Sequence, residues 1–154
     1  MALYLVQHGL SLSKDVDPEK GLSTAGMEAV QRMAQVARGY GISVSRIVHS
    51  GKNRARQTAD ILAAVLSPDH GVMTLADINP LDDVTIFASQ VDLAANTMVV
   101  GHLPYLERLT SFLILGEQEP VVFKLQNGGI LCLDQFENLE RPAIKWALMP
   151  QVSS

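Results

Sequence analysis

The sequence predicts a single α/β domain with a mostly parallel central sheet, flanking helices and an antiparallel hairpin near the C-terminus. Three observations predict this fold class. Short apolar runs alternate with helical patterns through the first two thirds of the chain. Glycine-rich turns and further apolar runs fill the last third. The 154 residues fit one domain, 1–154, because no linker, internal repeat or low-complexity stretch divides them.

The first strand is predicted at Leu3 to Val6, where four consecutive apolar residues suit a sheet that is covered on both faces. A helix from about Thr24 to Arg38 follows, because apolar side chains recur on one face and polar ones on the other. Gly39 and Gly41 end that helix.

Two further strand–helix pairs follow. Arg46 to His49 reads as the second strand, and the apolar stripe after it belongs to a helix that ends before Pro68. A third strand at Thr97 to Val100 leads to Pro104, which suits the first turn of another helix. Three such pairs in succession predict parallel strands joined by right-handed crossovers.

The last third of the chain has the pattern of antiparallel strands. Val121 to Leu125 and Ile130 to Leu133 flank Asn127-Gly128-Gly129, and such residues supply the positive φ angles of tight hairpin turns. Ala143 to Leu148 is predicted to add a final strand.

Composition excludes several classes of protein. The chain is 47% hydrophobic and 18% charged, with net charge −4 and no basic run, so nucleic acid is not an expected partner. Cys132 is the only cysteine, so no internal disulfide can form. No apolar stretch is long enough for a membrane span or a signal peptide. We therefore expect a cytoplasmic monomer.

The residues suited to chemistry follow the predicted strands. Gln7-His8-Gly9, Ser50 to Thr58 and Gly101 to Pro104 each begin where a strand ends, and ligands of open α/β sheets bind at the carboxyl ends of strands. His8, His102 and Arg54 are therefore expected to meet in one crevice. Glycine beside each histidine is expected to let a ligand approach the backbone.

This set of residue types suits phosphoryl transfer. A neutral imidazole can attack phosphorus and form a covalent phosphohistidine. The remaining requirement is mainly charge compensation for the phosphoryl oxygens, which Arg54 and Lys20 could supply. Arg54 would lie near a helix N-terminus, where free N–H groups favour anions.

Four segments occur in order along the chain: His8-Gly9, Leu22-Ser23-Thr24-Ala25-Gly26, Ser50 to Thr58, and Gly101-His102-Leu103-Pro104. Together they resemble the histidine phosphatase superfamily, also called phosphoglycerate mutase-like, and within it the small SixA-type phosphohistidine phosphatases. The resemblance covers nearly the whole chain and implies the phosphoglycerate mutase-like fold.

The resemblance also implies roles for these residues. His8 would be the nucleophile, Arg54 a phosphate clamp, and His102 the second histidine that stabilises the transferring group. The phosphate pocket would comprise Gln7, Gly9, Lys20, Arg54 and His102. The family needs no metal and no organic cofactor, and the expected partner is a phosphohistidine-containing protein or a small phosphorylated substrate.

The chain departs from the family pattern at two positions of this pocket. Gln7 stands where the Arg-His-Gly motif has arginine, which removes a charge and a bidentate fork. Losing one such donor predicts catalysis slower by about a hundredfold or more. Lys20 also replaces an arginine of the small phosphatases, but it remains a cation.

The general acid of larger family members has no clear counterpart here. Asp77, Asp82 and Asp83 are the nearest candidates. A phosphohistidine substrate relaxes this requirement, because imidazole leaves more readily than an alkoxide. The sequence therefore favours phosphoramidate over ordinary phosphomonoesters.

Three alternatives remain open. Gln7 could have converted the domain into a phosphate-binding module, or the substrate could be a small phosphomonoester. A metal pair of His8 and His102 is the third, although zinc sites normally need three or four ligands. His49 and His70 are interpreted as structural or solvated, because neither belongs to a motif.

Overall fold

A computed structural model describes residues 1–152 of the chain. It contains six strands, four α-helices and one short 3₁₀ helix within that range. In chain order these are β1 (Ala2–Gln7), α1 (Thr24–Gly39), β2 (Arg46–His49), α2 (Asn53–Leu66), β3 (Val72–Thr74), α3 (Val84–Gln90), η1 (Leu93–Ala95), β4 (Thr97–Gly101), α4 (Tyr105–Leu115), β5 (Ile130–Asp134) and β6 (Ala143–Leu148). The predicted α/β class is confirmed.

All six strands form one sheet in the order β3-β2-β4-β1-β5-β6. Strands β1 to β4 run parallel, whereas β5 pairs antiparallel with both β1 and β6. The carboxyl ends of β1, β2 and β4 therefore lie at one edge of the sheet, as the sequence predicts.

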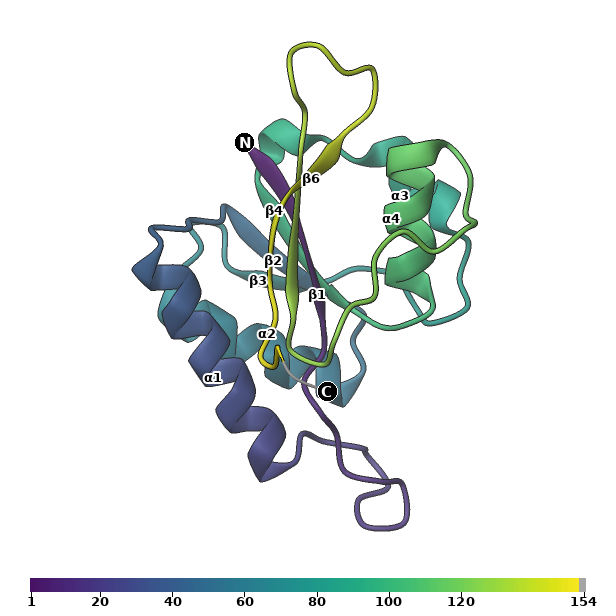
Figure 1. The fold of residues 1–154 in the computed structure, drawn as a ribbon. Coiled ribbons are helices and arrows are strands. Elements are labelled where there is room, and N and C mark those ends of the chain that lie inside the picture. Colours follow the sequence, from purple (N-terminus) through teal and green to yellow (C-terminus); the bar gives the residue numbers. More distant parts are fainter. Residues whose placement is uncertain (153–154) are drawn as a thin grey trace.

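Helices cover both faces of this sheet (Figure 1), with α1 and α2 on one side and α3 and α4 on the other. Successive side chains of β1 point to opposite faces of the sheet, so β1 contributes to the core on both sides. Tyr4 and Val6 pack into the α1/α2 core, while Leu3 and Leu5 pack into the α4 core. A strand that is buried on both faces explains the continuous apolar run in its sequence.

The predicted strand at Val121 to Leu125 is wrong, because these residues form no strand. Both edges of β5 are occupied, one by β1 and the other by β6, so no edge is left for this segment. The antiparallel hairpin of the C-terminal region is instead β5–β6. Leu125 packs into the core, and Lys124 Nζ lies 3.0 Å from Glu107 Oε2 on α4.

Three elements were not expected from the sequence: β3, α3 and η1. β3 has only three residues and is partly exposed, so it has little apolar pattern. Each of the two helices begins at an aspartate that accepts a backbone N–H two residues later, Asp83 from Thr85 and Asp92 from Ala94. Side-chain capping thus compensates for weak periodicity.

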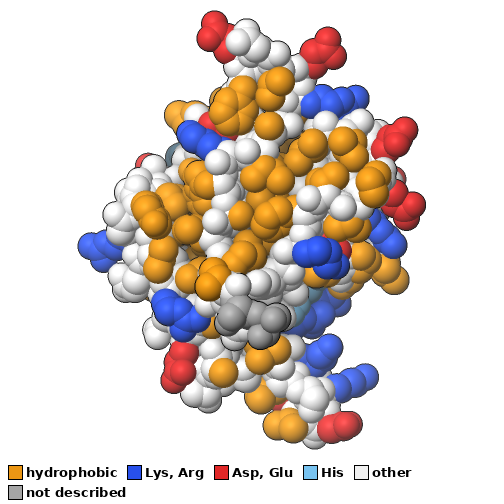
Figure 2. Space-filling model, viewed as in Figure 1, with side chains coloured by type: hydrophobic (Ala, Val, Ile, Leu, Met, Phe, Trp, Pro, Cys, Tyr) orange, Lys and Arg blue, Asp and Glu red, His pale blue; other side chains and the backbone are white. Residues whose placement is uncertain are grey.

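Strand β6 forms one edge of the sheet, and its residues are half-buried or exposed. Figure 2 shows apolar side chains gathered across the face on which β6 lies. Trp146 of this strand packs on Tyr4, with ring centroids 5.9 Å apart. Within residues 1–152, no helix combines the length and the apolar character that crossing a membrane requires.

Candidate active site

His8 is the first residue after β1, and backbone hydrogen bonds hold it between neighbouring elements. Its N–H donates to the carbonyl of Gly101 at 3.0 Å, at the end of β4. The next N–H, that of Gly9, donates to Thr58 Oγ1 on α2 at 2.9 Å. Because β4 and α2 both bond to this segment, the imidazole starts from a fixed backbone.

The ring of His8 has a defined tautomer. Nδ1 lies 2.7 Å from the carbonyl oxygen of Gly9, so Nδ1 carries the proton and donates it. Nε2 then carries no proton, and its lone pair accepts a hydrogen bond from Arg54 Nε at 3.3 Å. The His8 pKa is lowered to about 4, mainly by burial; the Gly9 hydrogen bond opposes this shift, and the charges of Arg54 and Lys20 add to it. His8 is therefore neutral at pH 7.

His102 follows β4 and faces His8, with ring centroids 5.0 Å apart. Its side chain is 1% exposed, and its Nε2 lies 2.6 Å from Ser50 Oγ. Burial is the main cause that lowers its pKa to about 3, followed by His8 and Arg54. The Nδ1 atom has no hydrogen-bond partner within residues 1–152.

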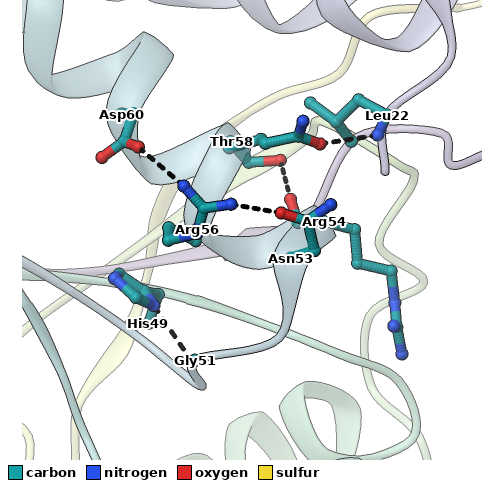
Figure 3. A network of polar contacts seen from close by, with 9 residues as sticks. Leu22, His49, Gly51, Asn53, Arg54, Arg56, Thr58 and Asp60 are labelled. Atoms are coloured by element: carbon teal, nitrogen blue, oxygen red, sulfur yellow. Dashed lines mark hydrogen bonds and ion pairs between the residues drawn. The ribbon is translucent and has the colours of Figure 1, made fainter. Parts of the chain in front are cut away.

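Arg54 lies in the first turn of α2, whose N-terminal N–H groups are not capped by a side chain. Lys52 occupies the N-cap position and makes no cap hydrogen bond. In Figure 3 the Arg54 guanidinium extends away from the ion pair that Arg56 and Asp60 form on the same helix. Burial lowers the Arg54 pKa, but the group remains a cation at neutral pH. Free N–H groups and a guanidinium together suit an anion.

Lys20 completes the positive field from the loop between β1 and α1. Its charge lowers the pKa of both His8 and His102. The loop is held by a bond from the Leu12 N–H to the Gly21 carbonyl at 2.8 Å. The Asp17 carboxylate also accepts the Gly21 N–H at 2.9 Å. Lys20 is therefore presented by an ordered loop.

Comparison with known proteins agrees with this arrangement. No protein-family model matches the chain. The phosphohistidine phosphatase SixA of Escherichia coli (strain K12) is 25% identical over 156 residues, which cover 97% of this chain and 94% of SixA. The chain is a homologue of SixA.

Solved structures show that the SixA fold is shared in full. The protein histidine phosphatase SixA complexed with tungstate matches with a TM-score of 0.82 at 23% identity, with 97% of each chain covered. A putative SixA from Agrobacterium tumefaciens gives 0.74 at 20% identity, over 96% of this chain and 97% of that one. A putative α-ribazole-5'-P phosphatase from Escherichia coli gives 0.76 at 17% identity, over 100% and 98%. The predicted phosphoglycerate mutase-like fold is confirmed.

The glycines beside the two histidines lie against other side chains, and the expected approach of a ligand to their backbone stays a prediction. A Cβ on Gly9 would lie 2.7 Å from Val30 Cγ2 and 3.2 Å from the carbonyl oxygen of Gly26, both on α1. A Cβ on Gly101 would meet the side chain of Leu106 at 3.4 Å. The absent side chain therefore serves helix packing at Gly9, whereas a Cβ on Gly101 would make an ordinary van der Waals contact. The Gly9 N–H is also taken by Thr58.

Gln7, the residue in place of the motif arginine of SixA-type enzymes, is 9% exposed. With its amide in the orientation that satisfies both ends, the nitrogen lies 3.3 Å from the carbonyls of Leu125 and Gln126. Its oxygen accepts from Asn127 Nδ2 at 3.2 Å. The carboxamide thus contacts the turn before β5, and its contact with phosphate stays a prediction.

Sequence reasoning assigned no site role to Ser50, Thr58 or Asn127. Thr58 was predicted as part of the Ser50 to Thr58 segment and of a buried helical stripe, without a role of its own, yet its hydroxyl also donates to the Arg54 carbonyl at 2.8 Å. Asn127 was interpreted as a turn former, but its amide donates to the His8 carbonyl at 3.0 Å. A polar residue within a buried stripe was the available signal for Thr58.

Other histidine and aspartate side chains considered in the sequence analysis form local hydrogen bonds. His49 is 5% exposed, and its Nδ1 accepts the Gly51 N–H at 3.0 Å (Figure 3), which agrees with its structural interpretation. Asp82 accepts the Asn79 N–H at 2.8 Å, and Asp83 caps α3. Among residues 1–152, no group of three or more His, Cys, Asp or Glu side chains is arranged to hold a metal ion.

Proposed function

We propose that the chain hydrolyses phosphohistidine on a protein substrate through a covalent phosphoryl intermediate on His8. One observation carries the proposal. The unprotonated Nε2 of His8 faces the Arg54 guanidinium, and the ring of His102 lies beside it. A nucleophile, a cation and a second imidazole in one place match the needs of phosphoryl transfer.

In the first step, Nε2 of His8 attacks the phosphorus of the substrate. A P–N bond forms to His8 while the P–N bond to the substrate imidazole breaks, and that imidazole, already protonated on its other nitrogen, leaves as the neutral base. Arg54 and Lys20 compensate the charge on the phosphoryl oxygens. The Gly9 carbonyl keeps accepting from Nδ1–H, so the positive charge that develops on His8 is stabilised.

In the second step, water attacks phospho-His8 and releases inorganic phosphate. An O–P bond forms, the P–Nε2 bond breaks, both protons of the water stay with the phosphate, and the imidazole of His8 returns to its neutral form. His102 donates to a phosphoryl oxygen when its Nε2–H turns from Ser50 towards the bound group. The free N–H groups of α2 add further donors.

Two observations support a phosphohistidine substrate. The curated relative is named for that activity. The carboxylates of Asp82 and Asp83, two candidates for the general acid, are engaged in local hydrogen bonds. A substrate whose leaving group needs little protonation, such as phosphohistidine, therefore suits this site better than a phosphomonoester. Similarity to the α-ribazole-5'-P phosphatase favours a small phosphomonoester as the second candidate.

Rapid quench with a ³²P-phosphohistidine protein tests the proposal. We expect an acid-labile, base-stable phosphoryl group on the wild type that disappears in His8→Ala. His70→Ala is the matched control, because His70 is exposed and belongs to no site motif. A chromogenic phosphomonoester run in parallel distinguishes the second candidate.

The outcomes separate the candidates. Turnover of the phosphoprotein alone supports the proposal, whereas turnover of the phosphomonoester alone supports the small-molecule function. If neither is hydrolysed while tungstate raises the melting temperature, the domain is a binding module, because only a ligand of the native state stabilises it.

A further inference from the structure

The carbonyl group of His8 is held by a turn from the far end of the chain. Asn127 Nδ2 donates to this carbonyl at 3.0 Å. The N–H of Gly128 donates to the carbonyl of Gln7 at 2.8 Å and lies 3.3 Å from that of His8. Gly128 has φ +80°, which a glycine adopts without strain. The turn therefore clamps the two peptide groups on either side of the nucleophile's Cα.

Gln7 in turn fixes the amide of Asn127. The two hydrogens on Asn127 Nδ2 have two acceptors, the His8 carbonyl at 3.0 Å and Gln7 Oε1 at 3.2 Å. The amide nitrogen of Gln7 is anchored on the carbonyls of Leu125 and Gln126. Every polar atom of the buried Gln7 carboxamide thus has a partner in this turn.

We propose that Asn127 is a positioning residue for His8, and that Gln7 orients the Asn127 amide. Rather than holding phosphate, the glutamine at position 7 then braces the backbone that carries the nucleophile. The inference rests on the phosphatase function proposed above. Gln7, whose replacement of the motif arginine suggested only a loss of catalytic rate, then has a positive structural role.

The chemical reason is the sensitivity of nucleophilic attack to geometry. The Gly9 carbonyl that selects the His8 tautomer lies one peptide group beyond the clamped His8 carbonyl, so rotation of this segment moves both the ring and its proton acceptor. Misplacement of a reacting atom by about 1 Å can cost a hundredfold in rate. Substrate contacts through Arg54 and Lys20 do not depend on Asn127.

The experiment compares Asn127→Ala and Gln7→Met, which removes the amide at nearly unchanged volume, with Gln126→Ala. Gln126 lies in the same turn, but its side chain bonds to Gln151. We expect about a tenfold to hundredfold fall in kcat for the first two variants. The affinity for tungstate should stay within about twofold, and Gln126→Ala should match the wild type.

Two further readouts identify positioning. The double variant should be no slower than Asn127→Ala alone, because both residues act through one hydrogen bond. Histidine ¹⁵N NMR of the ligand-free protein should show His8 protonated at Nδ1 in the wild type, with a mixture of tautomers in Asn127→Ala. This spectrum requires no turnover, so it tests the inference even if the phosphatase proposal fails.

The inference is overturned by unchanged His8 shifts in both variants, or by a loss that appears in tungstate affinity while kcat is retained. A fall in kcat for Gln126→Ala equal to that of Asn127→Ala would also overturn it, since the whole turn would then be responsible. If Asn127→Ala does not fold, Gln7→Met carries the same expectations with Asn127 intact.

Discussion

Arg54 Nε donates to His8 Nε2 at 3.3 Å, so the guanidinium occupies the lone pair from which the proposed attack starts. In the ligand-free protein the two groups satisfy each other. An incoming phosphoryl group offers the guanidinium stronger, charged acceptors, which releases Nε2 towards phosphorus. In the proposed mechanism, Arg54 therefore both occupies the His8 lone pair before the reaction and binds the substrate.

Replacing Arg54 by Gln should lower kcat/KM for phosphohistidine by about a hundredfold to a thousandfold, because a charged donor to the transferring group is lost. Arg54→Lys should recover only part of the rate, since an ammonium lacks the fork geometry. The matched control is Arg56→Gln on the same helix, whose partners are Asn53 and Asp60. Equal losses in Arg54→Gln and Arg56→Gln would contradict the assignment.

The two imidazoles make folding stability depend on pH. His102 has a pKa of about 3 in the folded protein against an ordinary 6.5, so the unfolded chain takes up the proton first as pH falls. The stabilisation is present above pH 6.5 and is lost progressively below it. We expect the free energy of unfolding to fall between pH 7 and 5 by about 1–2 kcal/mol per histidine. Urea titrations at both pH values measure it.

His102→Asn is the test of that attribution, because it removes the titrating group. The difference in unfolding free energy between pH 7 and pH 5 should be smaller in this variant than in the wild type. An identical difference would assign the pH dependence to other groups. The exposed His70 serves as control, and His70→Asn should leave the difference unchanged.

Two glycines of α1 should respond to alanine in opposite directions. A Cβ on Gly26 would lie 2.1 Å from the Leu10 carbonyl oxygen, so Gly26→Ala must displace the loop that follows His8. We expect a loss of about 1–3 kcal/mol or more. At Gly39 nothing lies within 4 Å, so Gly39→Ala should be neutral or stabilise by up to about 1 kcal/mol. Thermal unfolding of both variants checks the contrast.

Thr58→Val should weaken both folding and catalysis, because it deletes the hydroxyl between the Gly9 N–H and the Arg54 carbonyl. A buried donor left without its acceptor costs about 1–3 kcal/mol. Thr58→Ser keeps the hydroxyl and should restore kcat. If valine and serine behave alike, the methyl group rather than the hydroxyl is what matters at this position.

The elements that sequence reasoning found best are those with a strong apolar pattern. β2 and β6 occur at the predicted bounds, and α1 differs by one residue. The failure at 121–125 has a topological cause: apolar alternation cannot show that β1 and β6 already occupy both edges of β5.

The candidate site was predicted in part. Strand ends and motif order sufficed to bring His8, Arg54 and His102 together. The contacts of Asn127 and Gln7 could not be foreseen, because they join positions more than a hundred residues apart through backbone carbonyls. Such bonds leave no periodicity in the sequence.

The peptide around His8 draws its hydrogen bonds from β4, from α2 and from the turn before β5. A nascent or truncated chain that lacks the last of these would expose an imidazole without its final restraint. Alignment of this imidazole therefore depends on a contact between positions that lie 119 residues apart in the chain.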